Sequence, residues 1–250
     1  MDRIYLRNIV AVSIVAIALG GCTSGPPPSK QAPASDGGAT APAAGSQAAT
    51  SQASVTRSGN TITITGNNQQ TIPAIRFDLG AYIFKWSSTG AFMGITASDA
   101  GGASVGAISI SEANGDNLFV VNNDVVKPGD ITLQASSDGP WTITISKADA
   151  SAAVELPQTL SGEELKSVVS KPFNASQGSL KVSYTYKGTP TGTGTVAVCN
   201  SATGNYLVTE MMTAGKSSGE FKVEVPATGV YIAKTTFPKD SKGGDVTISK

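Results

Sequence analysis

Side chains able to do covalent or acid–base chemistry are few in this chain of 250 residues. The sequence contains no histidine, two cysteines (Cys22 and Cys199), and 18 acidic residues balanced by 18 basic ones. Without histidine there is no Ser-His-Asp or Cys-His nucleophile pair, no histidine-ligated zinc and no histidine pH switch. A net charge of zero and the lack of a basic cluster argue against a nucleic-acid partner.

The acidic residues also show no catalytic spacing. Spacing alone brings no two carboxylates together as a catalytic acid and base, although acids far apart in a sequence can meet in a glycosidase. The chain has no Ser-x-x-Lys spacing and no phosphate-binding glycine loop. We therefore predict that the protein is not an enzyme, and an unrecognised extracellular hydrolase is the catalytic alternative.

Three oxygen-bearing side chains, Glu112, Asn114 and Asp116, alternate across one expected hairpin. Oxygen ligands on neighbouring loops are what Ca²⁺ prefers. However, the chain lacks an Asp-x-Asp-x-Asp-Gly loop, and Asp and Asn are ordinary turn residues because they hydrogen-bond their own backbone. We favour solvated turns without a cofactor, with Ca²⁺ at these three residues as the alternative.

Two other polar positions have a recognisable chemistry. Asn174-Ala175-Ser176 is an N-glycosylation sequon, which has meaning only in an organism that glycosylates exported proteins. Cys199 is the one thiol left if Cys22 is modified. We expect it to be a small, semi-buried residue, because it lies just outside the alternating face of Val196 and Val198. An intermolecular bridge or a reactive thiol is the alternative, although no histidine is present to activate the thiol.

Aromatic residues are candidates for a carbohydrate-binding face. Trp86 and Trp141 are in phase with apolar neighbours along their expected strands, which favours core packing over a sugar-stacking platform. Tyr186 and Tyr206 lie at expected strand ends, where a ring can be exposed.

The N-terminus carries the most specific motif of the chain. Arg3 and Arg7 precede an apolar segment, residues 9–19, that is too short to span about 30 Å of hydrocarbon. It ends in Leu19-Gly20-Gly21-Cys22, where small residues admit a peptidase and a cysteine thiolate can accept a lipid.

This arrangement resembles the lipobox of prokaryotic lipoproteins. The resemblance implies that residues 1–21 are a signal peptide and that Cys22 becomes a diacylglyceryl-modified N-terminus. Acyl chains such as palmitate would then anchor the protein to a membrane, since two chains are about what stable anchoring requires. The implied location is the cell envelope, with the folded part outside the cytoplasm.

The segment that follows, residues 22–54, has the composition of a linker. After Cys22 it is built mainly from Pro, Ala, Ser, Gly and Thr, with no aromatic residue, Ile, Leu or Val. Such a segment cannot bury enough surface to offset its ordering entropy. We expect a disordered tether, with an O-glycosylated stalk as the alternative.

From Val55 onward the sequence alternates apolar and polar residues with a period of two, as in residues 61–65, 82–86 and 141–145. This pattern, punctuated by Gly-, Asn- and Pro-containing turns, is typical of antiparallel strands with one buried face. It predicts an all-β fold of two tandem antiparallel, jelly-roll-like β-sandwich domains. A capping-box spacing at Ser161 and Glu164 also predicts one short helix over residues 163–169.

An internal repeat supports the two domains. Residues 80–90 align without gaps on 178–188, and the chain end at 245–250 aligns on 142–147. Between them, 106–120 is placed on 194–208. We therefore expect domain 1 over residues 55–148 and domain 2, its repeat, over 149–250.

A Gly-x-Tyr-x-Phe-x-Trp strand from Gly80 and a closing Gly-x-Trp-Thr-Ile-Thr-Ile strand from Gly139 resemble small secreted sandwiches of the bacterial pre-peptidase C-terminal type. The likeness covers residues 76–147 and is weaker afterwards. It implies an accessory, binding or spacer module, and it transfers no catalytic residues. We expect a surface-tethered lipoprotein that binds an extracellular protein or carbohydrate. A purely structural spacer or assembly component of the envelope is the alternative.

Overall fold

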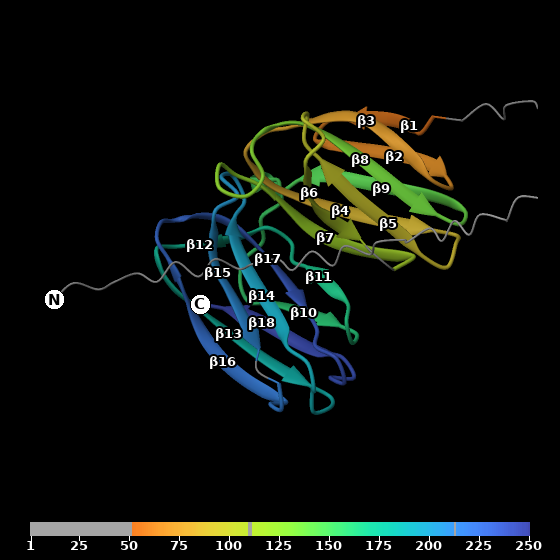
Figure 1. Ribbon diagram of the computed structural model, residues 1–250. Helices are drawn as coiled ribbons and strands as arrows, with labels where there is room; N and C mark the ends of the chain where they lie inside the picture. Colours follow the sequence, from red (N-terminus) through yellow and green to blue (C-terminus); the bar gives the residue numbers. More distant parts are fainter. Residues whose placement is uncertain (1–51, 110–111, 213) are drawn as a thin grey trace, which may run out of the picture. The chain divides into compact units, whose positions relative to one another are not determined.

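The computed structural model describes residues 52–109, 112–212 and 214–250. In these residues the regular structure consists of β-strands and one 3₁₀ turn, η1 (Ala150–Ala152). The strands pair in antiparallel sheets, so the predicted all-β fold is confirmed (Figure 1). The predicted signal peptide, Cys22 and nearly all of the predicted tether lie outside the described residues.

Sandwich 1 is formed by strands β1 to β9. Its first sheet has the order β1-β2-β9-β4-β7 and its second the order β3-β8-β5-β6. The bounds are β1 Ser54–Ser58, β2 Thr61–Asn67, β3 Gln70–Phe77, β4 Gly80–Ser88, β5 Met93–Ser98, β6 Ser104–Ser109, β7 Asn114–Val121, β8 Gly129–Ser137 and β9 Pro140–Lys147.

Sandwich 2 is formed by strands β10 to β18. One sheet has the order β10-β18-β13-β16, and the other has the order β11-β17-β14-β15 with β12 also paired to β17. The bounds are β10 Gln158–Gly162, β11 Ser167–Val169, β12 Phe173–Ala175, β13 Gly178–Tyr186, β14 Gly194–Asn200, β15 Tyr206–Met212, β16 Ser218–Val225, β17 Gly229–Thr236 and β18 Gly244–Ser249. Each of the four sheets takes its strands from one half of the chain only.

The two sandwiches share one topology, apart from the extra edge strand β1 in sandwich 1 and the extra short strand β12 in sandwich 2. The order β2-β9-β4-β7 corresponds to β10-β18-β13-β16, and β3-β8-β5-β6 corresponds to β11-β17-β14-β15. The register agrees as well, because Trp86 lies opposite Ile143 and the equivalent Tyr184 lies opposite Val246. These pairs match the first and last blocks of the sequence alignment.

The middle block of that alignment is wrong by one strand. It placed β6 on β14 and β7 on β15, whereas the topology makes β5 the equivalent of β14 and β6 the equivalent of β15. Both β6 and β14 carry a glycine followed by alternating residues. A period of two records only which face is buried, so it does not distinguish one strand from the next.

Both sandwich cores are built from the apolar residues of the alternating pattern. In sandwich 1, Trp86 is 7% exposed and Trp141 is 3% exposed, which confirms that both indoles belong to the core. Their ring nitrogens donate hydrogen bonds of 2.9 Å to the backbone oxygens of Glu112 and Asn68, respectively. In sandwich 2, Tyr186 is also buried, so the expectation of an exposed ring there is wrong, while Tyr206 is exposed.

The helix predicted over residues 163–169 does not form. The chain turns at Leu165, whose φ is +61°, and continues as β11. Two backbone hydrogen bonds of 3.0 Å, from Leu165 to Phe237 and from Phe237 to Lys166, hold this turn against the end of β17. Pairing with a long neighbouring strand thus outweighs a local capping signal, because helical preference is only a weak prior.

Apolar residues of the two sandwiches meet in a third buried cluster. Ala81, Leu118, Val120 and Ala148 contribute to it from one half of the chain, and Cys199 and Ile232 from the other. The described residues accordingly form one compact unit.

The loop between β14 and β15 adds polar contacts to this cluster. The Ala81 amide donates to the Ser201 oxygen (2.9 Å), and the buried Asn122 Nδ2 donates to the Gly204 oxygen (3.0 Å). Gly204 has a φ of +70°, and a Cβ on it would lie 2.6 Å from the Val121 oxygen. Only glycine combines that backbone conformation with so close an approach.

We predict that Gly204→Ala lowers the free energy of unfolding of the full chain by about 2 kcal/mol or more, because left-handed strain adds to the clash with Val121. Gly215→Ala is the matched control, since Gly215 has a φ of +82° but open space around its Cβ position. Calorimetric unfolding measures both variants. Equal losses in the two would contradict a role of the Gly204 loop in holding the sandwiches together.

Candidate functional site

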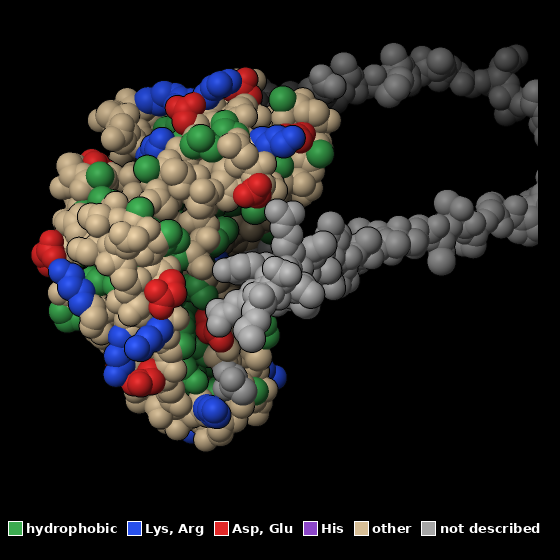
Figure 2. Space-filling model, turned by 90° about the vertical axis from the view of Figure 1, so that its left-hand side faces the viewer, with side chains coloured by type: hydrophobic (Ala, Val, Ile, Leu, Met, Phe, Trp, Pro, Cys, Tyr) green, Lys and Arg blue, Asp and Glu red, His purple; other side chains and the backbone are tan. Residues whose placement is uncertain are grey.

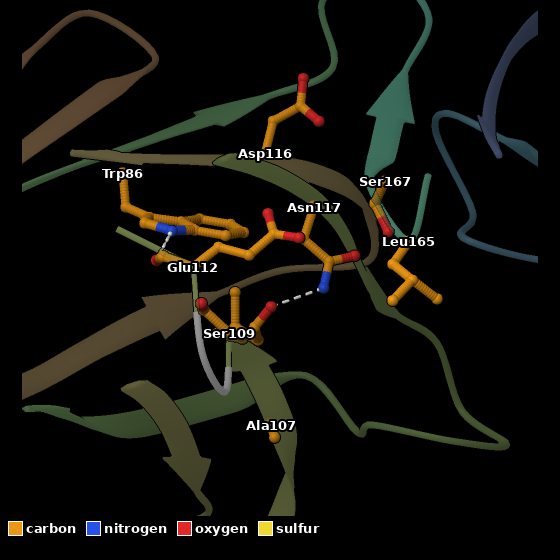
Figure 3. Close-up of a pocket in the computed structure, with 9 residues that line it drawn as sticks. Trp86, Ala107, Ser109, Glu112, Asp116, Asn117, Leu165 and Ser167 are labelled. Carbon is orange, nitrogen blue, oxygen red and sulfur yellow. Dashed lines mark hydrogen bonds between the residues drawn. The ribbon is translucent and has the colours of Figure 1, made fainter. Parts of the chain in front are cut away.

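A cavity of about 310 Å³ opens where the two sheets of sandwich 1 end, between the edge strands β6 and β7. The turn before β11 and β11 itself border it from sandwich 2. We call this cavity the crevice (Figure 3). Its lining residues are Trp86, Ala107, Ile108, Ser109, Glu112, Asp116, Asn117, Leu165 and Ser167.

Trp86 forms one wall of the crevice but is not a stacking platform. Its indole is packed in the core, and a Cβ on Gly115 would lie 2.5 Å from the Trp86 Cζ2 atom. Glycine at position 115, opposite Trp86 in the strand register, therefore leaves room for the ring to lie against β7. Because that leaves little of the ring face open, a stacked sugar ring is not the contact that this residue offers.

Asn117 presents an unsatisfied acceptor at the crevice. Its Nδ2 donates a hydrogen bond of 2.6 Å to the Ile108 oxygen, which joins β7 to β6. Its Oδ1 is buried and has no hydrogen-bond partner within the described residues. Leaving such an atom unpaired costs about 1–3 kcal/mol, so a ligand or water that donates to it, once the Asn117 side chain turns it into the crevice, would be stabilised.

Two carboxylates accompany this acceptor. Glu112 precedes β7. Asp116 lies opposite Lys85 of β4 in the strand register, on the face of the sheet that meets sandwich 2. Partial burial raises the pKa of Asp116, while the positive charges of Lys85 and Lys234 and a hydrogen bond from the Val169 backbone lower it in part. With Asn117 Oδ1, the crevice presents three acceptor groups.

The pKa of Lys234, the positive charge that faces Asp116, is shifted in the opposite direction. Burial lowers the pKa of the Lys234 ammonium, and the charge of Asp116 raises it in part. Desolvation therefore penalises both charges, and each one partly compensates the other.

The opposite wall is formed by Leu165 and Ser167. Leu165 is 59% exposed, and its positive φ is unusual for a bulky residue. The Ser167 hydroxyl shares a hydrogen bond of 3.0 Å with Thr236. The crevice thus combines acceptors on the sandwich 1 side with an apolar side chain and a hydroxyl on the sandwich 2 side.

The structure separates the three candidate calcium ligands. Glu112 and Asp116 both line the crevice, but Asn114 is exposed on β7 and lies outside the lining. In the part of the chain that the structure describes, no three Asp, Glu, Cys or His side chains converge as a metal site. Of the three candidates, only Glu112 and Asp116 are therefore placed to share an ion in the crevice.

The other sequence candidates lie away from the crevice. Asn174 is exposed on β12, and its Nδ2 donates to Glu155 at 3.3 Å. Cys199 is fully buried between the sandwiches rather than semi-buried, and burial raises the pKa of its thiol to about 12. A thiol so placed is protonated at neutral pH.

One catalytic spacing was overlooked in the sequence. Gly102-Ala-Ser104-Val-Gly106 has the Gly-x-Ser-x-Gly form of a nucleophile elbow. That motif works in a strand–turn–helix with a histidine partner, whereas Ser104 opens strand β6 in a chain without histidine. The spacing is therefore not a catalytic motif here.

Asn117, Leu165 and Ser167 were also missed by the sequence analysis. Asn117 carried a usable signal, because it is in phase with the buried residues Phe119 and Val121 along β7. A polar residue in a core-facing position either finds a partner or marks a site. Leu165 and Ser167 had no comparable signal, since only tertiary packing brings them to the crevice.

We predict that Asp116 titrates above its usual pKa of 3.8 and that Lys85→Met raises its pKa further, because the variant removes a nearby positive charge. Because the pKa of Asp116 is higher in the folded chain than in the unfolded chain, protonated Asp116 favours folding at low pH. This contribution to the free energy of unfolding is lost as the pH rises through the pKa of Asp116 in the folded chain. Carboxyl ¹³C NMR titration of the full chain measures the shift. Lys222→Met, on β16, is the control, and a fall in the Asp116 pKa in Lys85→Met would refute the electrostatic account.

Comparisons with known proteins provide no relative by sequence. No protein-family model matches the chain, and no curated protein matches it. Among solved structures it is similar to the tandem CBM22 domains of Paenibacillus barcinonensis Xyn10C, with 12% identity over 79% of this chain and 90% of that chain and a TM-score of 0.22. It is also similar to a conserved protein of unknown function from Pseudomonas aeruginosa (10% identity, 75% and 79% covered, TM-score 0.23) and to an allantoicase (13%, 79% and 80%, 0.24). At these TM-scores the likenesses carry no argument about function.

Proposed function

We propose that this protein is a lipid-anchored binding protein of the cell envelope that holds a ligand rich in hydrogen-bond donors, such as a carbohydrate, in the crevice. The observation that carries the proposal is the Asn117 Oδ1 atom, buried at the crevice without a partner among the described residues. The carboxylates of Glu112 and Asp116 add further acceptors. Hydroxyl groups complement such a site, because each can donate to an oxygen. No reaction is assigned to it.

The sequence supports the anchoring part of the proposal. Cys22 directly follows an apolar segment and two glycines, and a low-complexity segment links it to β1. Within the described residues, the structure has no helix of the length and apolarity needed to cross a membrane. Two acyl chains on Cys22 would supply stable attachment.

The second candidate function is that of a structural spacer in the cell envelope. The contact between the two sandwiches favours it. The shared apolar cluster and the two hydrogen bonds of the β14–β15 loop tie the sandwiches to each other. An element so braced can hold other envelope components at a fixed separation without binding a small ligand.

We predict that the full-length protein in detergent binds a neutral oligosaccharide on a glycan array, and that Asn117→Ala weakens that binding about tenfold by isothermal titration calorimetry. Glu112→Gln, which keeps the shape of the side chain, should weaken it as well. Gln134→Ala, an exposed change on β8, is the control. A separate titration with Ca²⁺ alone tests whether Glu112 and Asp116 hold that ion.

An array without any bound glycan would contradict the carbohydrate part of the proposal and favour the spacer. Binding that survives unchanged in Asn117→Ala and Glu112→Gln would show that the crevice is not the site. Circular dichroism of each variant establishes that a loss of binding is not a loss of fold.

We predict that Cys22→Ser abolishes membrane attachment, because the serine hydroxyl cannot accept the lipid in place of the thiol. The variant should appear in the medium or accumulate as the unprocessed precursor in cell fractions analysed by immunoblot. Cys199→Ser, at the buried cysteine, is the control and should stay attached. Membrane-bound Cys22→Ser protein of mature mass would show that the anchor lies elsewhere.

A further inference from the structure

The outward face of strands β1, β2 and β9 in sandwich 1 carries a hydroxyl side chain at every outward position where all three strands pair, and only Asn67 and Pro140 follow at the end of the β2–β9 pair. The inward positions alternate with them and include the buried residues Ile64, Ile143 and Ile145. We call this set the hydroxyl face. Its residues are Ser54, Thr56, Ser58, Thr61, Thr63, Thr65, Thr142, Thr144 and Ser146.

The strand register arranges these side chains in three rows across the sheet. The middle row runs from Thr56 through Thr63 to Thr144, and its flanking rows run in parallel two residues away on each strand. Neighbouring strands lie about 4.8 Å apart, and alternate residues along a strand about 6.7 Å apart. Threonine is stiff at χ1, so the hydroxyls are held in a repeating pattern before any ligand arrives.

The hydroxyl face is uncharged and its hydroxyls are unused. The outward positions of β1, β2 and β9 include no Asp, Glu, Lys or Arg, and Lys85 lies beside Thr144 on the next strand, β4. Within the described residues, Thr63, Thr65, Thr142 and Thr144 make no side-chain hydrogen bond. On the side of the molecule that Figure 2 shows, Lys and Arg side chains are interspersed with Asp and Glu side chains and form no patch of one sign.

Sandwich 2 provides an internal comparison, because its equivalent positions are occupied differently. Thr159 and Thr247, the equivalents of Thr63 and Thr144, hydrogen-bond each other at 3.0 Å. Ser161 likewise donates to Asp245. The same face of sandwich 2 also carries an ion pair of 2.7 Å between Lys181 and Glu220. The shared topology therefore does not by itself require free, uncharged hydroxyls at these positions.

One end of the hydroxyl face is hollowed. A cavity of about 310 Å³ is lined by Thr65 and Thr142 of the face and by the exposed Ser87 of β4, which lies opposite Thr142 in register. Pro140 and Thr89 close its end. No charged residue lines it. A volume of this size is at the lower end of the range of small-molecule pockets.

We propose that the hydroxyl face is a second binding surface, distinct from the crevice, and that it takes an uncharged polysaccharide. Each hydroxyl both donates and accepts, as do the hydroxyls of the polymer. An uncharged ligand leaves no ion to be buried without a partner, so the two surfaces are matched in charge. One sugar ring fits the hollow at Thr65 and Thr142, and the rows contact the rings that follow. Each contact is weak, and their number supplies the affinity.

The test is affinity electrophoresis of the full-length protein in native gels that contain dextran, mannan or galactan, with alginate as the charged counterpart. At least one neutral polymer should retard the protein, and alginate should not. The double variant Thr63→Val and Thr144→Val keeps the β-branched shape but removes two hydroxyls, so it should reduce the affinity about tenfold. The equivalent double variant in sandwich 2, Thr159→Val and Thr247→Val, is the matched control and should be retarded like the original protein.

Failure of every neutral polymer to retard the protein would overturn the proposal. So would equal retardation of the Thr63/Thr144 variant and the original protein, or stronger retardation by alginate than by the neutral polymers. The Thr63/Thr144 variant should keep any affinity that the crevice has for an oligosaccharide. The experiments can therefore contradict binding at the hydroxyl face without contradicting binding in the crevice, and the reverse.

Discussion

The structure depends on the alternation of buried and exposed residues across hydrogen-bonded strands. Ile64 lies opposite Ile143 and Phe84 opposite Ile145, and each of the four side chains is at most 1% exposed. A slip of one residue in any of these strands would expose its whole apolar set and bury its hydroxyls. The register of the core therefore also determines which side chains stand on the outer face and in what order.

The two sandwiches show how one topology supports different surfaces. Equivalent strands pair in equivalent register, as the pairs Trp86–Ile143 and Tyr184–Val246 demonstrate. Outside the cores the halves have diverged. Sandwich 1 keeps unpaired threonines where sandwich 2 has internal hydrogen bonds. The open edge of sandwich 1 at β6 and β7 is bordered by a turn from the other half. Buried positions constrain each other, and exposed positions are free to vary.

The contact between the sandwiches creates the crevice and has an electrostatic cost. Packing of the β7 region against sandwich 2 removes Asp116 and Lys234 partly from water, and burial then disfavours both charged forms. The same contact buries Cys199 and places the Gly204 loop against β4 and β7. Sites at the junction of two domains commonly combine such partly buried charges with a concave surface.

The sequence alone determined the fold class, the buried tryptophans and the alignment of the outer repeat blocks, because these follow from a local period of two and from glycine positions. It also contained the signal for Asn117, a polar residue in a core-facing position, although that signal was not used. It did not determine that residues 163–169 turn at Leu165 and form β11, since pairing with β17 outweighed the capping signal of Ser161 and Glu164. Only the tertiary structure brought Leu165 and Ser167 to Asn117, because residues about fifty positions apart become neighbours through packing that no local pattern records.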